Sequence, residues 1–260
     1  MNEEEKSNSH IQMPKCVLKR FENQHHQYYY YDVEKDYIGN HGHATTINTE
    51  QGFYSKEAEM LLSANIEKPF SEVCRRIDKI DINPPRGHID AQFDYFAKRF
   101  IYALFARNPD SIDRINRFPF FSAFLSSQQL HDIGMMLGLA AEQERDFLAG
   151  YGTTVAVNAT EVPFILPTCG AYSIHMLGFE HIIMPVSPKK AIAFIEPNGK
   201  DSIIHDGIVN PYRIDIEHDI HALNIGAFST QRSYGNGYVV SPRRDALEDA
   251  FRDTAKYSQS

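Results

Sequence analysis

Two charged side chains occupy positions where a helical pattern predicts apolar residues. Leu62 opens a stripe of apolar residues in steps of three and four, and one more step back reaches Glu59. Phe93 opens a second stripe, and fourteen residues further along the same face lies Arg107. An isolated buried charge is costly, so a carboxylate and a guanidinium on core-facing sides are expected to pair. Such a pair serves chemistry in some sites and, more often, links two packed helices.

A second acid flanks the first stripe. Glu67 follows Ile66 directly, so it lies beside the face that carries Glu59. Two neighbouring carboxylates can hold a divalent metal ion or relay protons. Taken alone, Glu67 is also typical of a solvated helix flank. The sequence therefore leaves the cofactor unknown, with a divalent metal ion as the candidate.

The familiar signatures of covalent, phosphate-binding and zinc chemistry are missing from the chain. It holds no GxSxG, Walker-type loop, HExxH or CxxC. Cys169 is placed like a nucleophile after an apolar run, yet a small buried thiol is the more frequent reason for such a position. The pairs His41 with His43 and His218 with His221 lack a third ligand, so surface or capping histidines are expected there.

The segment from 153 to 195 is expected to form the sheet core. Apolar runs at 155–157, 162–166, 182–186 and 191–195 are short and bounded by Asn, Pro, Gly or Ser, which is typical of strands. Further strands are predicted at 28–33 and 238–240. The segment 34–44, which follows the first of these strands, is predicted as a loop. Strands at both ends of the chain predict an α+β fold with a mostly antiparallel sheet.

Helices are expected in the middle of the chain, packed on that sheet. One begins near Ser55 as N-cap and is broken or kinked at Pro69, and a second spans about 89–107. Helical patterns continue through 110–125, 128–149, 214–227 and a charged tail at 242–256. Residues 15–21 are expected to be extended or a short helix.

Length and composition limit the class of protein. The 260 residues carry a net charge of −8, so general attraction to nucleic acid is not supported, although a local basic groove is left open. No run approaches eighteen apolar residues, so no membrane partner is expected; the polar start lacks a signal peptide, and three scattered cysteines fit a reducing cytoplasm. We expect a disordered acidic leader at 1–9, one α+β domain at 10–240 with its helical block at about 55–150, and a surface helix with a frayed tail at 241–260. Other partners are unknown, and an oligomer is not excluded.

Several motifs in order resemble a bacterial family of uncharacterised proteins catalogued as domain of unknown function four-two-three-eight. The segment from His10 to Phe21 is similar to its opening His-x-x-Val-Pro-x-x-x-Leu-x-x-Phe. The other resembling segments are Tyr30-Tyr31-Asp32, Phe53-Tyr54 with Glu59 and Ile66-Glu67, Arg107-Asn108-Pro109, Val162–Ile165, Pro185–Lys189 and Leu223-Asn224. The resemblance covers about 10–240, nearly the whole chain, and bears on the fold and the candidate site more than on the reaction.

The chain departs from that family after its Pro-Phe-Ile motif. Relatives usually continue Ser-Asp-Asn-Pro, whereas this sequence has Pro167-Thr168-Cys169-Gly170. If the absent aspartate is a ligand or base in relatives, this member is inactive or uses other residues.

Two hypotheses follow. In the first, the protein is a cytosolic bacterial hydrolase, for example a metal-assisted nuclease in defence against mobile elements. His10 is then the general base or a ligand, Glu59 and Glu67 hold a metal ion or relay protons, and Arg107 binds an anionic substrate. In the second, the protein is a non-enzymatic partner-binding or regulatory domain with a structural Glu59–Arg107 pair, as the acidic charge and missing nucleophile motifs favour.

Overall fold

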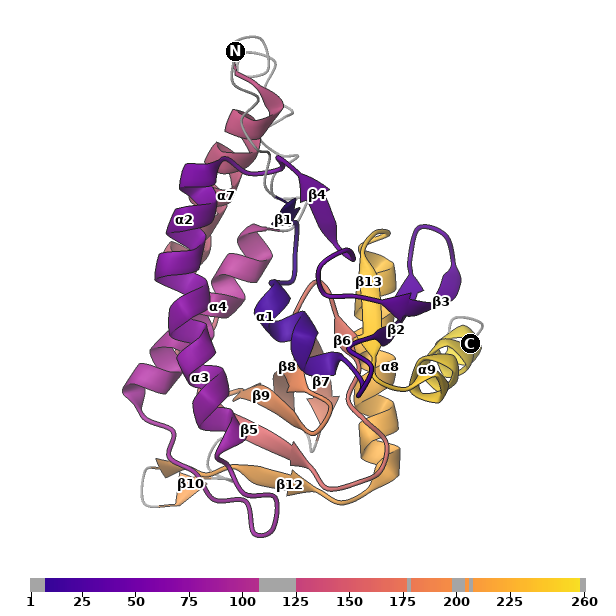
Figure 1. Ribbon diagram of the computed structural model, residues 1–260. Coiled ribbons are helices and arrows are strands. Elements are labelled where there is room, and N and C mark those ends of the chain that lie inside the picture. Colours follow the sequence, from indigo (N-terminus) through magenta and orange to yellow (C-terminus); the bar gives the residue numbers. More distant parts are fainter. Residues whose placement is uncertain (1–7, 108–124, 177–178, 198–203, 206–207, 258–260) are drawn as a thin grey trace.

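The computed structural model describes residues 8–107, 125–176, 179–197, 204–205 and 208–257, and within them the chain is an α+β protein (Figure 1). The strands are β1 (Asn8–His10), β2 (Tyr28–Asp32), β3 (Tyr37–Gly42), β4 (Thr49–Gln51), β5 (Gly152–Asn158), β6 (Leu166–Pro167), β7 (Tyr172–Met176), β8 (Phe179–Ser187), β9 (Lys190–Ile195), β10 (Ile204–His205), β11 (Ile208–Val209), β12 (Tyr212–Ile214) and β13 (Tyr238–Ser241). The helices are α1 (Lys15–Leu18), the 3-10 turn η1 (Lys19–Phe21), α2 (Lys56–Leu62), the π-helical turn η2 (Ser63–Glu67), α3 (Lys68–Asp78), α4 (Ala91–Ala106), α7 (Ser127–Arg145), α8 (Glu217–Ser233) and α9 (Arg244–Tyr257).

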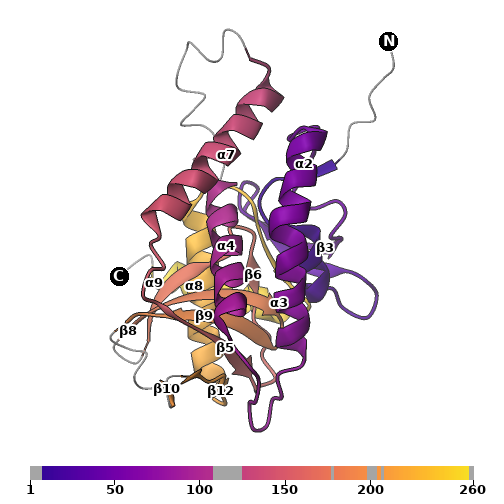
Figure 2. The ribbon, with the colours of Figure 1, turned by 90° about the vertical axis from the view of Figure 1, so that its left-hand side faces the viewer.

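A five-stranded sheet in the order β12-β5-β9-β8-β7 occupies the centre, antiparallel except for the parallel pair β12–β5. The strands predicted at 155–157, 182–186 and 191–195 are confirmed, since they lie in β5, β8 and β9. Val155 and Val157 pack in the core cluster that contains α3 and α4, whereas Ala156 packs with α8 on the opposite face. Figure 2 shows α3 and α4 crossing in front of this sheet. Because both faces are covered, the strands are continuously apolar.

A second, four-stranded sheet in the order β3-β2-β13-β6 joins the two ends of the chain. β13 pairs antiparallel with β2, with Val239 opposite Tyr31. This is the arrangement predicted for the N-terminal and C-terminal strands. The register of β2 against β3 shifts between Tyr28 and Tyr30, so the buried tyrosines are Tyr28 and Tyr31 rather than alternate ones.

Two sequence predictions about strands are wrong. The segment 34–44, predicted as a loop, contains β3, in which Gly39 and Gly42 leave room for the rings of Tyr30 and Tyr28; a Cβ on Gly39 would lie 2.3 Å from the Tyr30 ring. Conversely, most of 162–166 is not a strand. Its amides are satisfied elsewhere, since Phe164 N donates to Pro188 O and Ile165 N to the Asn224 side chain.

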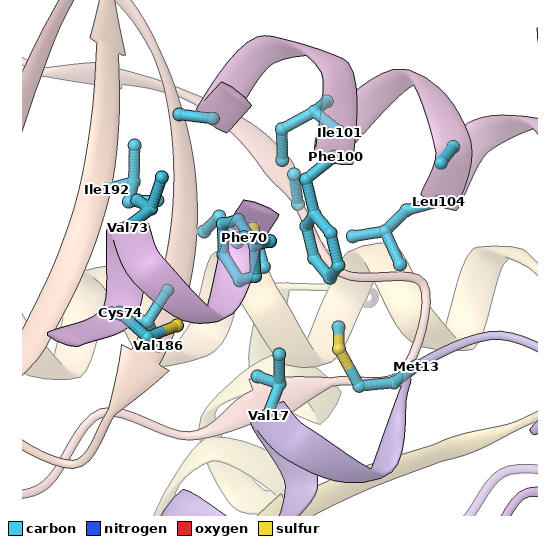
Figure 3. Packing of buried hydrophobic residues seen from close by; sticks show 14 of the residues in the cluster. Met13, Val17, Phe70, Val73, Cys74, Phe100, Ile101, Leu104, Val186 and Ile192 are labelled. Atoms are coloured by element: carbon cyan, nitrogen blue, oxygen red, sulfur yellow. The ribbon is translucent and has the colours of Figure 1, made fainter. Parts of the chain in front are cut away.

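The helical block follows the predicted pattern. Ser55 caps α2 by accepting from Ala58 N at 3.1 Å, and Asp90 caps α4 by accepting from Phe93 N at 2.8 Å. Phe70 of α3 stacks on Phe100 of α4 with ring centroids 3.6 Å apart (Figure 3). Apolar side chains from α1 and the sheet surround this pair in Figure 3. The stripes that predicted the two helices therefore form their shared core.

The remaining predictions are resolved in part. The segment 15–21 forms α1 and η1. The helical pattern predicted at 214–227 starts too early, since Ile214 ends β12 and α8 runs from Glu217 to Ser233. The tail helix α9 buries Ala246, Leu247 and Ala250 against α8 and its neighbours. The disordered leader predicted at 1–9 is wrong at its end, because Asn8 and Ser9 belong to β1. Residues 1–7, the helical stretch at 110–124 and the final residues 258–260 lie outside the described residues. None of the helices in the described part of the chain combines the length and hydropathy that a membrane span requires.

Candidate functional site

A pocket of about 390 Å³ lies where β1, the start of α1 and the helices α2, η2 and α4 meet. Its volume is in the range of small-molecule sites. All four residues proposed from the sequence line it. The complete lining is His10, Lys15, Thr45, Glu59, Glu67 and Arg107.

The N-terminal elements hold one side of the pocket. His10 ends β1, which pairs antiparallel with β4 and places His10 opposite Thr49. Pro14 precedes α1, whose first residue is Lys15, and Thr45 is exposed in the connection between β3 and β4. A short strand pair and a short helix thus bring residues 10, 15 and 45 to the helical block.

The π-helical turn explains how two acids eight residues apart reach the same pocket. Lys68 N donates to Ser63 O, a bond that spans five residues instead of four. Pro69 stands next in the chain and has no N–H for the α-helical ladder, which is the physical reason for the wider turn. Eight α-helical residues would turn Glu67 about 80° away from Glu59, and one extra residue in the turn restores a nearly common face. The break predicted at Pro69 therefore has a direct consequence for the site.

Arg107 is the most deeply placed group of the pocket, and its ion-pair partner corrects the sequence prediction. It forms the C-cap of α4, and its side chain is 2% exposed. Its Nη2 donates to Oε1 of Glu67 at 2.8 Å, and Nη1 lies 3.5 Å from Gln12 O. No ion pair joins Arg107 to Glu59 among the described residues. The apolar stripes predict that both charges face inward, but they do not include the π-turn, which places Glu67 within hydrogen-bond distance of Arg107.

Glu59 is half-buried, and its Oε1 has no hydrogen-bond partner in the described chain. Burial raises the pKa of this carboxyl above its ordinary value, opposed by the Ser9 hydroxyl and by Arg107. The carboxyl therefore holds its proton to higher pH than a free glutamate. This is the property of a general acid.

His10 is a neutral imidazole with a defined tautomer. Its Nε2 lies 2.8 Å from the carbonyl oxygen of Ala44, which can only accept, so Nε2 carries the proton. Nδ1 therefore presents a lone pair. Burial lowers the pKa of His10 below its ordinary value, although the bond to Ala44 and the charge of Glu67 oppose the shift. A neutral ring with a free lone pair is the property of a general base.

The described residues do not provide a group of three metal ligands for the metal-assisted form of the first hypothesis. Among residues 8–107, 125–176 and the other described segments, no three His, Cys, Asp or Glu side chains are grouped to hold a metal ion. The carboxylate of Glu67 is engaged by Arg107, which leaves His10 and Glu59 as the remaining donors of the pocket. Two protein ligands are fewer than structural or catalytic zinc sites provide.

The other candidate residues lie outside this pocket. Cys169 is buried, and burial raises the pKa of its thiol to about 12, so it is not an activated nucleophile. His41 contacts the Gln27 side chain and His43 contacts His26 O, which separates them as ligands. His218 is exposed on α8.

Thr168 stands where the predicted resemblance would place an aspartate. It is fully buried, donates to Gln12 Oε1 at 2.7 Å and accepts from Tyr238 N at 2.9 Å. Because Gln12 O in turn contacts Arg107, this hydroxyl supports the segment beside the pocket instead of lining it.

Two groups near the pocket escaped the sequence argument. Lys15 lies in the short element predicted at 15–21, where it is the first residue of α1 after the N-cap Pro14. Tyr54 belongs to the loop before α2, and its electrostatic neighbours include Arg107 and Glu59. Neither follows a periodic stripe, so periodicity could not select them.

Comparisons with known proteins do not extend this picture. No protein-family model matches the sequence, and no curated protein or solved structure matches it significantly either. The resemblance to the uncharacterised bacterial family therefore stays a prediction, and the function is argued from the pocket alone.

Proposed function

We propose that the chain is a hydrolase that cleaves an ester bond next to an anionic group by general acid–base catalysis. The observation that carries the proposal is the convergence of His10, Glu59 and Arg107 in one pocket. The two titratable groups have pKa shifts in the directions that favour a neutral imidazole beside a protonated carboxyl. Titratable groups perturbed in this way are frequent in catalytic pockets.

In the proposed reaction, Nδ1 of His10 takes a proton from water as the water oxygen bonds to the ester centre. The bond from that centre to the leaving oxygen breaks, and Glu59 supplies the proton that the leaving oxygen needs. The proton on His10 then returns through water to Glu59, so the cycle balances. Each of the two proton transfers contributes typically about 10²–10⁴-fold to such a rate.

The cations of the pocket define the substrate's charge. Arg107 is fixed by Glu67, and Lys15 forms no ion pair within the described residues. A fixed guanidinium and a free ammonium favour an anion beside the acid–base pair. The nuclease acting in defence against mobile elements is the narrower version of this proposal, with nucleic acid as the anionic ester.

The test is hydrolysis by the full chain of a panel containing DNA, RNA, nucleotides and aryl phosphate esters, with Mg²⁺, with Mn²⁺ and with a chelator. His10→Asn and Glu59→Gln are expected to lower kcat on a cleaved substrate by roughly 100-fold or more. Matched controls are His43→Asn, which removes an imidazole that also contacts a backbone carbonyl, and Glu57→Gln, an exposed acid on α2. Cleavage abolished by the chelator would establish the metal-assisted version.

The proposal fails if no ester in the panel is cleaved under any condition. It also fails if His10→Asn and Glu59→Gln retain the activity of their controls. Either result would favour the second candidate.

The second candidate is a non-enzymatic partner-binding or regulatory domain. The buried Arg107–Glu67 pair favours it, because two of the pocket's charges neutralise each other as a structural ion pair does. Under this candidate, Glu59→Gln and His10→Asn change the melting temperature without removing any catalytic activity. A cleaved substrate whose turnover depends on both residues would contradict it.

A further inference from the structure

Three buried polar atoms have no hydrogen-bond partner in the described chain; two belong to residues that line the pocket, and the third belongs to Tyr54, whose electrostatic neighbours include both of them. They are Oη of Tyr54, Oε1 of Glu59 and Nε of Arg107. Tyr54 and Arg107 are only 1% and 2% exposed. Folded proteins pair nearly all of their buried polar groups with protein atoms, ordered water or a ligand, so three unpaired atoms close together make this pocket a place where a bound group can complete them.

The available groups are mostly hydrogen-bond donors. The guanidinium of Arg107 can only donate. Burial raises the pKa of Tyr54, so its hydroxyl keeps its proton as a donor throughout the working range of pH. Lys15 lines the same pocket, where it forms no ion pair with the described residues, and Thr45 adds a hydroxyl at the exposed rim. A set of donors with an unpaired cation fits an oxyanion.

The number of donors selects among oxyanions. Arg107, Lys15 and Thr45 line the pocket, and Tyr54, an electrostatic neighbour of Arg107, adds a fourth donor group. The ammonium alone has three N–H bonds. A carboxylate or a phosphodiester offers two non-bridging oxygens, whereas the terminal phosphate of a monoester offers three strong acceptors. Two phosphate oxygens can accept hydrogen bonds from Arg107 and Tyr54, and the third can accept from Lys15 and Thr45 at the rim.

We propose that this pocket binds the terminal phosphate of a phosphate monoester, with Arg107 and Tyr54 at its buried end and Lys15 and Thr45 at its rim. The inference rests on the proposed function, because it names the anion on which the acid–base pair acts. The reacting centre is then phosphorus: its bond to the leaving oxygen breaks while a bond to the water oxygen forms. His10 and Glu59 keep the proton transfers described above.

The exposure of the lining residues orients the ester. Arg107 is buried, Lys15 is half-buried and Thr45 is exposed. The phosphate therefore lies against Arg107 while the remainder of the ester extends past Thr45 towards solvent. Inorganic phosphate, a phosphorylated small molecule and the phosphorylated end of a nucleic acid all present this group.

Calorimetric titration of the full chain tests the proposal. Inorganic phosphate is expected to bind, and dimethyl phosphate and acetate, each with two acceptor oxygens, are expected to bind roughly 10-fold or more weakly. Adenosine monophosphate and an oligonucleotide with or without a 5′-phosphate then distinguish the sources. Equal affinity for dimethyl phosphate, or no binding of inorganic phosphate, would overturn the proposal.

Tyr54→Phe gives the sharpest variant, because it deletes a hydroxyl that bonds to nothing in the described protein. The melting temperature should be unchanged or higher, while phosphate affinity falls roughly 10-fold. The matched control is Tyr28→Phe, which deletes another buried, unpartnered hydroxyl that lies at a different pocket. If Tyr54→Phe weakens phosphate no more than Tyr28→Phe does, the proposal is wrong.

The same measurements separate this proposal from the hydrolase itself. Phosphate binding with the predicted Tyr54 dependence, but no cleaved ester, would support the phosphate site and contradict the hydrolase. Ester cleavage that depends on His10 and Glu59 without phosphate binding would do the reverse.

Discussion

The buried ion pair between Arg107 and Glu67 predicts an asymmetry between its two deletions. Glu67→Ala leaves a guanidinium that is 2% exposed without its carboxylate, and removing one partner of a buried pair costs about 3–5 kcal/mol. Arg107→Met fills a similar volume and leaves Glu67, which is 27% exposed and can turn to water, so we expect a cost of about 1 kcal/mol. At about 2 °C per kcal/mol for a chain of this size, Glu67→Ala lowers the melting temperature by about 8 °C.

The stability of the double variant relative to Glu67→Ala tests the same explanation. Glu67→Ala combined with Arg107→Met no longer contains an uncompensated buried charge, so it is expected to be more stable than Glu67→Ala alone. The assay is chemical unfolding of all three variants and the wild type, followed by circular dichroism. Glu72→Ala is the matched control, since Glu72 pairs with Arg75 on the surface of α3 and such pairs contribute about 1 kcal/mol or less.

Two outcomes would refute this reasoning. The first is a Glu67→Ala variant no less stable than Glu72→Ala, which would mean that the guanidinium of Arg107 finds water. The second is a double variant less stable than Glu67→Ala, which would mean that the side chain of Arg107 stabilises through packing alone.

Further predictions concern pH and packing. The rate on a cleaved ester is expected to rise with pH as His10, whose pKa is lowered below 6.5, loses its proton. The rate is expected to fall at higher pH as Glu59, whose pKa is raised above 4.5, loses its proton, so the optimum is acidic. A rate that rises continuously to pH 9 would contradict these two roles. Because the pKa of Glu59 is raised, its ionisation costs stability at neutral pH, so Glu59→Gln should be more stable by about 1 kcal/mol or less at pH 8 and equal below pH 4; thermal melts at both pH values decide this. Lys190→Met should lower the free energy of unfolding in denaturant by about 3 kcal/mol, because the buried ammonium donates to three carbonyls at the C-terminal end of α3 at 2.7–3.0 Å. An unchanged free energy of unfolding would show that water caps the helix equally well. Gly237→Ala should be destabilising by about 2 kcal/mol or more, since φ is +79° and the added Cβ would lie 2.6 Å from Gln12 Oε1; an unchanged melting temperature would contradict the close packing.

Helical periodicity predicted the parts of the fold that depend on one buried stripe. The Leu62 stripe and the Phe93 stripe predicted both helices and the faces that form their shared core, because an apolar stripe must be buried. Ser55 was predicted as the first N-cap, whereas the Asp90 cap of α4 was not predicted. The central strands were equally visible, since a sheet covered on both faces needs unbroken apolar runs. The pairing of the two chain ends also followed from where strands occur.

Features fixed by tertiary contact were not visible in the same way. β3 lacks an apolar run, and only its pairing with β2 and the fit of Gly39 against Tyr30 make it a strand. Conversely, Phe164 and Ile165 read as a strand, but a loop carbonyl and the side chain of Asn224 take their amides.

His10, Glu59, Glu67 and Arg107 were predicted as candidate site residues, but the partner of Arg107 was not. The inward positions of Glu59 and Arg107 followed from the stripes, because charge on an apolar face needs a reason. The ion pair went instead to Glu67, since a π-turn changes the helical phase by one residue and no periodic template includes it. Tyr54 and Lys15 come from a loop and a short helix, where sequence spacing says little about direction.

The central claim is that His10 is a neutral base whose Nδ1 is free to act in the pocket. Nitrogen-15 NMR of the imidazole across a pH titration, with His43→Asn to help assignment, tests this without knowledge of the substrate. We predict the Nε2–H tautomer, a pKa below 6.5, and a change at Nδ1 when inorganic phosphate is added. An Nδ1–H tautomer, or a ring that is charged at pH 7, would contradict the account.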